Sequence, residues 1–349
     1  MFRRKFLQTA GAATLAITFQ SQLLAAVRKN KNIKPIEGSW FEFQHHSAIE
    51  GKYWNFSLGI FTAQQWEQKI KEIADAGIRY LVLLDIAIYD KSFYPSKLLP
   101  QHQLGCDDPL ETILSAADKY GIRFFISNGF FGDWRDSVFI MQDKAVNALR
   151  IKAMNEVAEK YSHHRSFYGW YYPNETGISG HYDDIFINYV NGSSAEARKL
   201  TPKAKILIAP YGTRNVKADD KYVRQLEQLD VDIIAYQDEV GVQKTKAEES
   251  SKYFEQLYLM HTKAGKAKLW ADVEVFAFEG DVYKSALLPA PPERVIKQLE
   301  SVSPFVDKIL IYQYIGMINK PGTDVFAGHP DSAKLYEQLV EHNYLNAKL

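Results

Sequence analysis

The chain has 349 residues, of which 46% are hydrophobic and 24% are charged, a composition typical of a globular protein with a large core. Its 42 lysines and arginines balance its 42 aspartates and glutamates. This zero net charge argues against a nucleic-acid-binding protein, which usually presents a basic surface. The only cysteine is Cys106, which excludes an internal disulfide.

The first 26 residues are predicted to be a signal peptide for the twin-arginine export pathway. They carry the pair Arg3 and Arg4, followed by a modestly apolar run that ends near Ala26. This run is rich in alanine, threonine and glutamine, so it is a poor match to a membrane span, which needs ~20 apolar residues. We therefore expect a periplasmic or secreted protein that is not inserted in a membrane once the signal is removed. Residues 27–36 are expected to form a linker.

From residue 37 onward, short hydrophobic runs alternate with amphipathic stretches. The first of these stretches places Trp66, Ile70 and Ile73 on one stripe of a helix. The eight runs of strand character are 38–46, 79–89, 122–131, 167–175, 204–212, 231–239, 267–276 and 307–316. Helices are predicted at 62–77, 107–121, 141–161, 181–199, 219–229, 248–263, 291–302 and 331–342.

This alternation, at roughly 40 residues per unit, predicts an α/β fold with a single (β/α)8 TIM barrel over residues 37–349. A doubly wound open sheet would normally carry a glycine-rich phosphate loop after its first strand, and none is present. The longest connections, 46–61, 89–107, 131–140 and 276–291, all follow strands. In a barrel they lie on the C-terminal face, where active sites are built.

Polar residues gather at the C-terminal ends of the predicted strands. The candidates for substrate binding are Glu42, His45, Asn128, Asn174, Tyr211, Tyr236, Asp238, Asp272, Tyr312 and Gln313. Carboxylates, amides and aromatic faces are the groups that bind and cleave sugars. Aromatic residues in or beside the long loops, which together suggest a carbohydrate platform, are Trp54, Phe93, Tyr94, Phe130, Phe131, Trp134, Phe276 and Phe278. We therefore expect a carbohydrate substrate and no cofactor.

The strongest motif is the pair Asn174 and Glu175 at the end of the fourth strand, with Glu274 at the end of the seventh. This arrangement resembles the large clan of retaining (β/α)8 glycoside hydrolases. The resemblance implies that Glu175 is the acid/base, that Asn174 binds the substrate 2-hydroxyl, and that Glu274 is the nucleophile. Residues 37–345 are also similar to an uncharacterised family of exported bacterial barrels described only as candidate glycosidases. The chain departs from the clan at Pro173 and in the absence of a tryptophan after the eighth strand, which ends in YQY.

Three alternatives stay open at the level of sequence. Asp272 and Glu274 are two residues apart and point the same way from a regular strand, so either could be the nucleophile, and Glu274 is preferred because it lies nearer the strand end. An inverting hydrolase would use Asp238, Glu239 or Asp272 as its base. A non-catalytic glycan-binding barrel would not bring the two glutamates together.

Two further expectations concern electrostatics and metals. In a retaining site, the negative charge of Glu274 is expected to raise the pKa of Glu175. Tyr236, on the neighbouring strand, is a candidate to orient Glu274. His45 and His46 are adjacent, so on a strand they would point to opposite sides and could not bind one ion together. We therefore expect no metal site.

Overall fold

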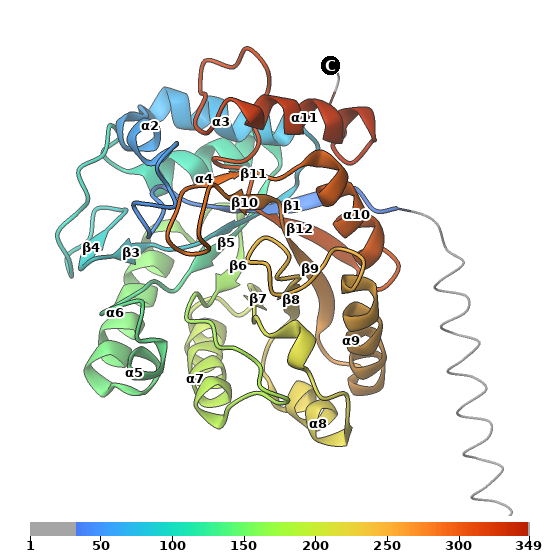
Figure 1. Cartoon of the computed structure of the whole chain (residues 1–349). Helices are drawn as coiled ribbons and strands as arrows, with labels where there is room; N and C mark the ends of the chain where they lie inside the picture. Colours follow the sequence, from blue (N-terminus) through green and yellow to red (C-terminus); the bar gives the residue numbers. More distant parts are fainter. Residues whose placement is uncertain (1–32, 348–349) are drawn as a thin grey trace, which may run out of the picture.

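The computed structural model describes residues 33–347, so the predicted signal peptide and most of the predicted linker lie outside the described residues. The centre of the fold is a closed barrel of parallel strands in the order β1-β12-β9-β8-β7-β6-β5-β2 (Figure 1). These strands are β1 (Ile36–Phe41), β2 (Tyr80–Leu83), β5 (Arg123–Ser127), β6 (Phe167–Tyr171), β7 (Lys205–Ile208), β8 (Ile233–Gln237), β9 (Lys268–Glu274) and β12 (Lys308–Tyr312). The predicted (β/α)8 barrel is confirmed.

The barrel strands are hydrophobic on both faces because both faces are buried. In β12, Ile309 and Ile311 pack in the layer between the strands and the helices, whereas Leu310 packs in the barrel interior. Large aromatic side chains fill that interior, and the rings of Trp40 and Tyr171 meet edge to face at 5.9 Å. The interior is therefore a packed core below the C-terminal mouth.

Helices surround the barrel on its outside (Figure 1). Those that connect successive barrel strands or close the chain are α3 (Ala63–Asp75), α4 (Pro109–Tyr120), α6 (Lys144–Tyr161), α7 (Asp184–Leu200), α8 (Asp220–Gln228), α9 (Ser250–Ala264), α10 (Pro292–Val302) and α11 (Asp331–Glu341). Local signals set their ends. Thr62 and Gln65 form a capping box at the start of α3, and α4 ends at Gly121 in the left-handed conformation, with φ 73°.

The connections on the C-terminal face contain short elements that sequence periodicity does not indicate. They are α2 (Asn55–Ile60), α5 (Ser137–Gln142), the 3-10 turn η1 (Thr213–Asn215), the hairpin of β3 (Ala87–Ile88) with β4 (Lys91–Ser92), and the hairpin of β10 (Phe276–Phe278) with β11 (Leu287–Pro289). These segments are too short to show a hydrophobic period. They give the barrel mouth walls of defined structure.

Within residues 33–347, no helix combines the length and the apolar character needed to cross a membrane. The predicted export by the twin-arginine pathway depends on residues outside this range and stays a prediction.

Gly169 in β6 provides a test of how tightly the barrel is packed. A Cβ added there would lie 2.3 Å from the carbonyl oxygen of Lys205 and 2.7 Å from the ring of Phe125. We expect Gly169→Ala to lower the free energy of unfolding by about 1–3 kcal/mol, measured by urea denaturation. Gly192→Ala is the matched control, because Gly192 lies in α7 with open space around it, and it should stabilise the protein by about 0.5–1 kcal/mol. Similar effects of the two substitutions would contradict this view of the packing.

Candidate active site

A cavity of about 590 Å³ opens among the loops that follow the barrel strands. Its polar wall consists of Glu50, Asn174, Glu175, Gln237, Glu239, Asp272 and Glu274, together with His46, Arg135 and Lys244. Its aromatic wall consists of Phe130, Trp134, Tyr211, Phe276, Phe278, Tyr283 and Tyr312. Strand ends distant in the sequence therefore meet at one pocket.

The structure divides the site residues predicted from the sequence into two sets. Those that line the cavity are Asn174, Glu175, Tyr211, Asp272, Glu274 and Tyr312. Those that do not are Glu42, His45, Asn128, Tyr236, Asp238 and Gln313, all of them buried. The six residues of the second set can therefore influence the cavity only through the residues that they contact.

Glu175 lies four residues beyond β6 and is held by two donors from the barrel interior. The hydroxyl of Tyr171 donates to its Oε1 at 2.6 Å, and Nε2 of Gln237 donates to its Oε2 at 2.5 Å. Desolvation raises the pKa of Glu175 to about 7, although both hydrogen bonds lower it. Burial, rather than the expected charge of Glu274, is therefore the main cause of the shift.

Glu274 and Asp272 both face the barrel interior, because alternate residues of β9 share a face with the interior residue Trp270. Oε2 of Glu274 accepts a hydrogen bond from the backbone N–H of Val242 at 2.9 Å. Burial and the charge of Asp238 raise the pKa of Glu274 to about 8, although this hydrogen bond and the charge of Arg294 lower it.

Asp272 lies two residues before Glu274 on β9, deeper in the barrel, and has fewer hydrogen-bond donors to stabilise a negative charge. Its Oδ1 is buried and has no hydrogen-bond partner in the described part of the chain. Burial, followed by the charges of Glu274 and Glu175, raises the pKa of Asp272 well above its usual range. Asp272 is therefore harder to ionise than an exposed aspartate.

Asp238 lies behind Glu274 and is not among the residues that line the cavity, so its predicted contact with substrate stays a prediction. Its Oδ1 accepts the backbone N–H groups of Glu274 at 3.2 Å and Val240 at 3.3 Å, and its Oδ2 accepts Nε2 of Gln298 at 2.7 Å. The carbonyl of Glu274 also accepts hydrogen bonds from Gln298 at 3.0 Å and Arg294 at 2.9 Å. This network fixes the backbone at the end of β9.

Tyr236 does not orient Glu274, contrary to the expectation from the sequence. It lies on the outer face of β8, where its hydroxyl contacts the hydroxyls of Tyr222 at 2.8 Å and Tyr182 at 3.1 Å, and Nε2 of His261 at 3.1 Å. The next residue, Gln237, faces inward and contacts Glu175. Gln237, rather than Tyr236, is therefore the residue of β8 that contributes to the site.

Asn128 also lies behind the cavity. Its Oδ1 accepts the hydroxyl of Tyr189 at 3.2 Å, and its Nδ2 donates to Ser193 at 3.4 Å. The same Tyr189 hydroxyl accepts a hydrogen bond from Nδ2 of Asn174 at 3.1 Å. Asn128 can therefore position Asn174 through Tyr189, but it does not line the cavity as a substrate ligand.

Glu42 organises a buried network beneath the mouth. Its Oε1 accepts hydrogen bonds from Trp54 Nε1 and Gln313 Nε2, each at 2.7 Å, and its Oε2 lies 3.1 Å from Nδ1 of His45. Nε2 of His45 lies 3.3 Å from Oε2 of Glu50. The two carboxylates on either side raise the pKa of His45 to about 9, against the desolvation that lowers it.

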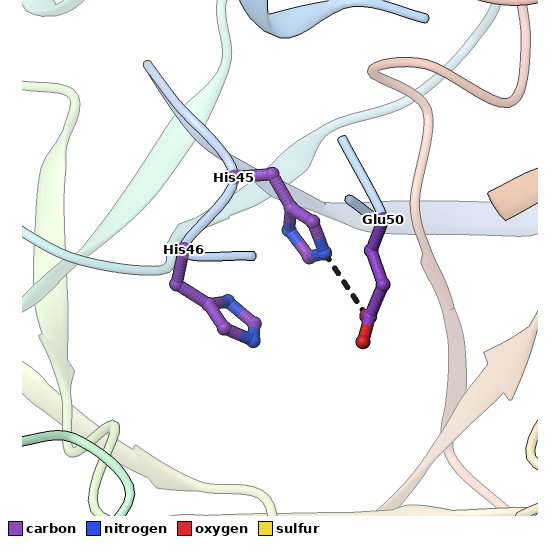
Figure 2. Close-up of side chains that lie close together, drawn as sticks. All are labelled: His45, His46 and Glu50. Carbon is purple, nitrogen blue, oxygen red and sulfur yellow. Dashed lines mark hydrogen bonds and ion pairs between the residues drawn. The ribbon is translucent and has the colours of Figure 1, made fainter. Parts of the chain in front are cut away.

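The premise that excluded a metal site is wrong. Strand β1 ends at Phe41, so His45 and His46 lie in the following loop, and their ring centroids are 4.3 Å apart. Figure 2 shows both rings on the same side as Glu50, and the potential ligand atoms of the three residues lie within 4.8 Å of one another. A second group with this spacing, Glu111, His163 and His164, lies outside the cavity.

Several contacts of the site are not indicated by the sequence. Tyr171 and Gln237 hold Glu175, and Val242 holds Glu274. Strand alternation could have identified Gln237, because it shares a face with Ala235 and Ile233 of the interior. The contact from Val242 depends on the path of the loop after β8, for which the sequence gives no signal.

The site can be set beside known families and structures. Residues 36–324 match the family described as Domain of unknown function (DUF4434). No curated protein matches the chain.

Solved structures share the barrel. A candidate α-L-fucosidase from Bacteroides thetaiotaomicron VPI-5482 is 17% identical with a TM-score of 0.72, and the alignment covers 91% of this chain and 95% of that one. A family 5 glycoside hydrolase, a mannosidase from Rhizomucor miehei, is 12% identical with a TM-score of 0.53, covering 89% and 92%. A β-galactosidase from Marinomonas ef1 is 11% identical with a TM-score of 0.56, covering 87% and 58%. At these identities the likeness is one of fold.

The raised pKa of Glu175 makes its ionisation unfavourable in the folded protein. The pKa rises from 4.5 to about 7 on folding, so the folded state binds the proton more tightly and loses stability as the pH rises through this interval. We expect Glu175→Gln to raise the free energy of unfolding at pH 8 by up to about 3 kcal/mol, because the shift is about 2.5 pKa units and one unit corresponds to about 1.4 kcal/mol. Near pH 4 the gain should vanish. Denaturant titrations at pH 4 and pH 8 measure the change in the free energy of unfolding. An increase of equal size at both pH values would contradict the pKa shift.

Proposed function

We propose that this chain, which belongs to the family described as Domain of unknown function (DUF4434), is a glycoside hydrolase that acts with retention of configuration. The observation that carries the proposal is that Glu175 and Glu274 line one cavity from different strands and have different hydrogen-bond partners. A glycosidase needs two carboxyl groups that flank the scissile bond and play different roles. The glycosidase descriptions of the three similar structures favour the same class of reaction.

In this proposal Glu175 is the acid/base. In the first step its proton passes to the glycosidic oxygen while the carboxylate of Glu274 attacks the anomeric carbon, which gives a covalent glycosyl ester and a free leaving alcohol. In the second step Glu175 takes a proton from water, and the resulting hydroxyl displaces Glu274 from the anomeric carbon. A pKa of about 7 suits a group that must give and then take a proton near neutral pH.

The choice of Glu274 over Asp272 as the nucleophile follows from their surroundings. A nucleophilic carboxylate has to be ionised. The pKa of Glu274 is raised to about 8 overall, but a backbone N–H donor and the attraction of Arg294 oppose this shift. Asp272 has an unpartnered buried oxygen and three acidic neighbours. Glu274 also lies nearer the mouth, at the last position of β9.

The walls of the cavity fit a carbohydrate. Aromatic rings such as Trp134, Tyr211 and Phe276 offer flat apolar faces for sugar rings, and Asn174 and Gln237 offer amides for hydroxyl groups. A non-catalytic glycan-binding barrel would not need both glutamates in one cavity.

An inverting mechanism is the second candidate, favoured by one observation. Glu239 lines the cavity, and its Oε1 lies 3.3 Å from Arg214 and 4.0 Å from Lys244, two cations that support an ionised base. The configuration of the first-formed product separates the two candidates. Retention favours Glu274 as the nucleophile, and inversion favours Glu239 as the base.

Removal of the nucleophile is the most specific test. We expect Glu274→Ala to reduce kcat by at least about 10³-fold on any cleaved glycoside, because the covalent step is lost. Added azide should restore turnover and give a glycosyl azide of inverted configuration, identified by NMR. Asp272→Asn is the matched control and should not acquire azide rescue. If azide rescues Asp272→Asn but not Glu274→Ala, then Asp272 is the nucleophile.

The second test addresses the acid/base. We expect kcat/KM to fall above pH ~7 as Glu175 loses its proton, and Glu175→Ala to remove this basic limb. The variant should retain most of its kcat/KM on substrates with good leaving groups, because these need little proton donation in the first step. Its kcat should fall on all substrates, because the second step loses its base. Asn147→Ala, at an exposed position of α6 outside the cavity, serves as a control that keeps the basic limb. A basic limb that persists in Glu175→Ala would assign it to another group.

A further inference from the structure

We propose that His45, His46 and Glu50 bind a divalent transition-metal cation of the Zn²⁺ class at the wall of the cavity. The three side chains lie on the loop after β1 and converge as Figure 2 shows, with their potential ligand atoms within 4.8 Å of one another. This binding site does not depend on the proposed glycosidase reaction.

The donor set suits such an ion. Two imidazole nitrogens and one carboxylate oxygen form a known zinc ligand set that leaves a fourth position open. Nε2 of His45 lies 3.3 Å from Oε2 of Glu50, and a bound ion would replace the proton that Nε2 carries in this contact. Two ligands of a tetrahedral zinc, each bound at ~2.0–2.1 Å, are separated by roughly 3.3 Å, so this pair already has the spacing of a ligand pair.

The surroundings of His45 match those of a metal-binding histidine. Its other ring nitrogen, Nδ1, lies 3.1 Å from Oε2 of Glu42. Histidines that bind metals usually donate this second N–H to a carboxylate, which fixes the tautomer and the orientation of the ring. Glu42 is itself fixed by hydrogen bonds from Trp54 and Gln313.

Two unpartnered groups point to a missing ligand. Nδ1 of His46 is buried and has no hydrogen-bond partner among residues 33–347. Asp85 is fully buried, neither of its carboxyl oxygens has a partner within that range, and it interacts electrostatically with Glu42 and His45. Buried polar groups without partners are rare, and a cation bound beside Glu50 would lie in a negatively charged environment that also includes Glu42.

The loop holds these ligands in place before any ion binds. The side chain of Asn55 accepts the backbone N–H of His45 at 2.7 Å and donates to its carbonyl at 3.2 Å. The hydroxyl of Tyr89 donates to the carbonyl of His46, whose ring packs against Trp134 at 4.5 Å between centroids. Binding would therefore need little rearrangement of the backbone.

The position of the site would allow a bound ion to contact a molecule in the cavity. His46 and Glu50 both line the cavity, so the open coordination position of the ion would be accessible from the cavity. An oxygen of the molecule in the cavity could fill it. If that molecule is a sugar, as the proposed function holds, the oxygen is one of its hydroxyl groups.

The test is a titration of the full chain with ZnCl₂ alone, after removal of metal by chelator and dialysis, followed by calorimetry. The His163→Ala variant serves as the background, because it weakens the second His/Glu group. In that background we expect one tight site, weakened at least about tenfold by His46→Ala and by Glu50→Gln, and about 10–100-fold by Glu42→Gln through the orientation of His45. Circular dichroism checks that each variant is folded.

Binding of Co²⁺ provides a second readout that does not involve activity. We expect the visible absorption of a four-coordinate cobalt site in the His163→Ala background and its loss in the His46→Ala double variant. Zinc affinity that is unchanged by His46→Ala and Glu50→Gln, or tight binding that disappears with His163→Ala alone, would overturn the proposal. Failure of metal binding would leave the roles of Glu175 and Glu274 unaffected, because their tests use product configuration and azide rescue.

Discussion

The alternation of side chains along the closed barrel strands is the constraint on which the rest of the site depends. In β9 it places Asp272 and Glu274 on the interior face with Trp270 below them. In β8 it places Gln237 inside and Tyr236 outside. A change of register by one residue would exchange these faces and remove the carboxylates from the cavity.

Burial of several acidic groups at one mouth is unfavourable, and the fold offsets it with specific donors. Glu175 receives hydrogen bonds from Tyr171 and Gln237, while Asp238 receives them from two backbone N–H groups and Gln298. Asp272 has fewer donors. This unequal distribution gives chemically similar groups different surroundings and different affinities for a proton.

The sequence indicated the barrel because its strands and helices carry strong local signals. The capping box at Thr62 and the left-handed Gly121 act within a few residues, and hydrophobic periodicity marks the elements between them. The sequence also placed Glu175 and Glu274 at strand ends, and both line the cavity. It failed where strands end earlier than their hydrophobic runs.

The loop after β1 illustrates that failure. His45 and His46 were placed on a strand, although β1 stops at Phe41 and the loop turns both rings to one side. Contacts such as the one between Gln298 and Asp238, 60 residues apart, depend on the whole fold and have no local signature.

The hairpin of β10 and β11 follows directly after the strand that carries Glu274, and its Phe276 and Phe278 form part of the cavity wall. Glu274, by contrast, is anchored through its backbone to Arg294 and Gln298 of α10. Arg294 also donates to the carbonyl oxygen of Phe276 at 2.5 Å, so the start of the hairpin shares this support with Glu274, whereas its later residues do not. Insertions or deletions beyond Phe276, toward the turn of the hairpin, could therefore reshape the cavity wall during evolution while the backbone of Glu274 keeps its position.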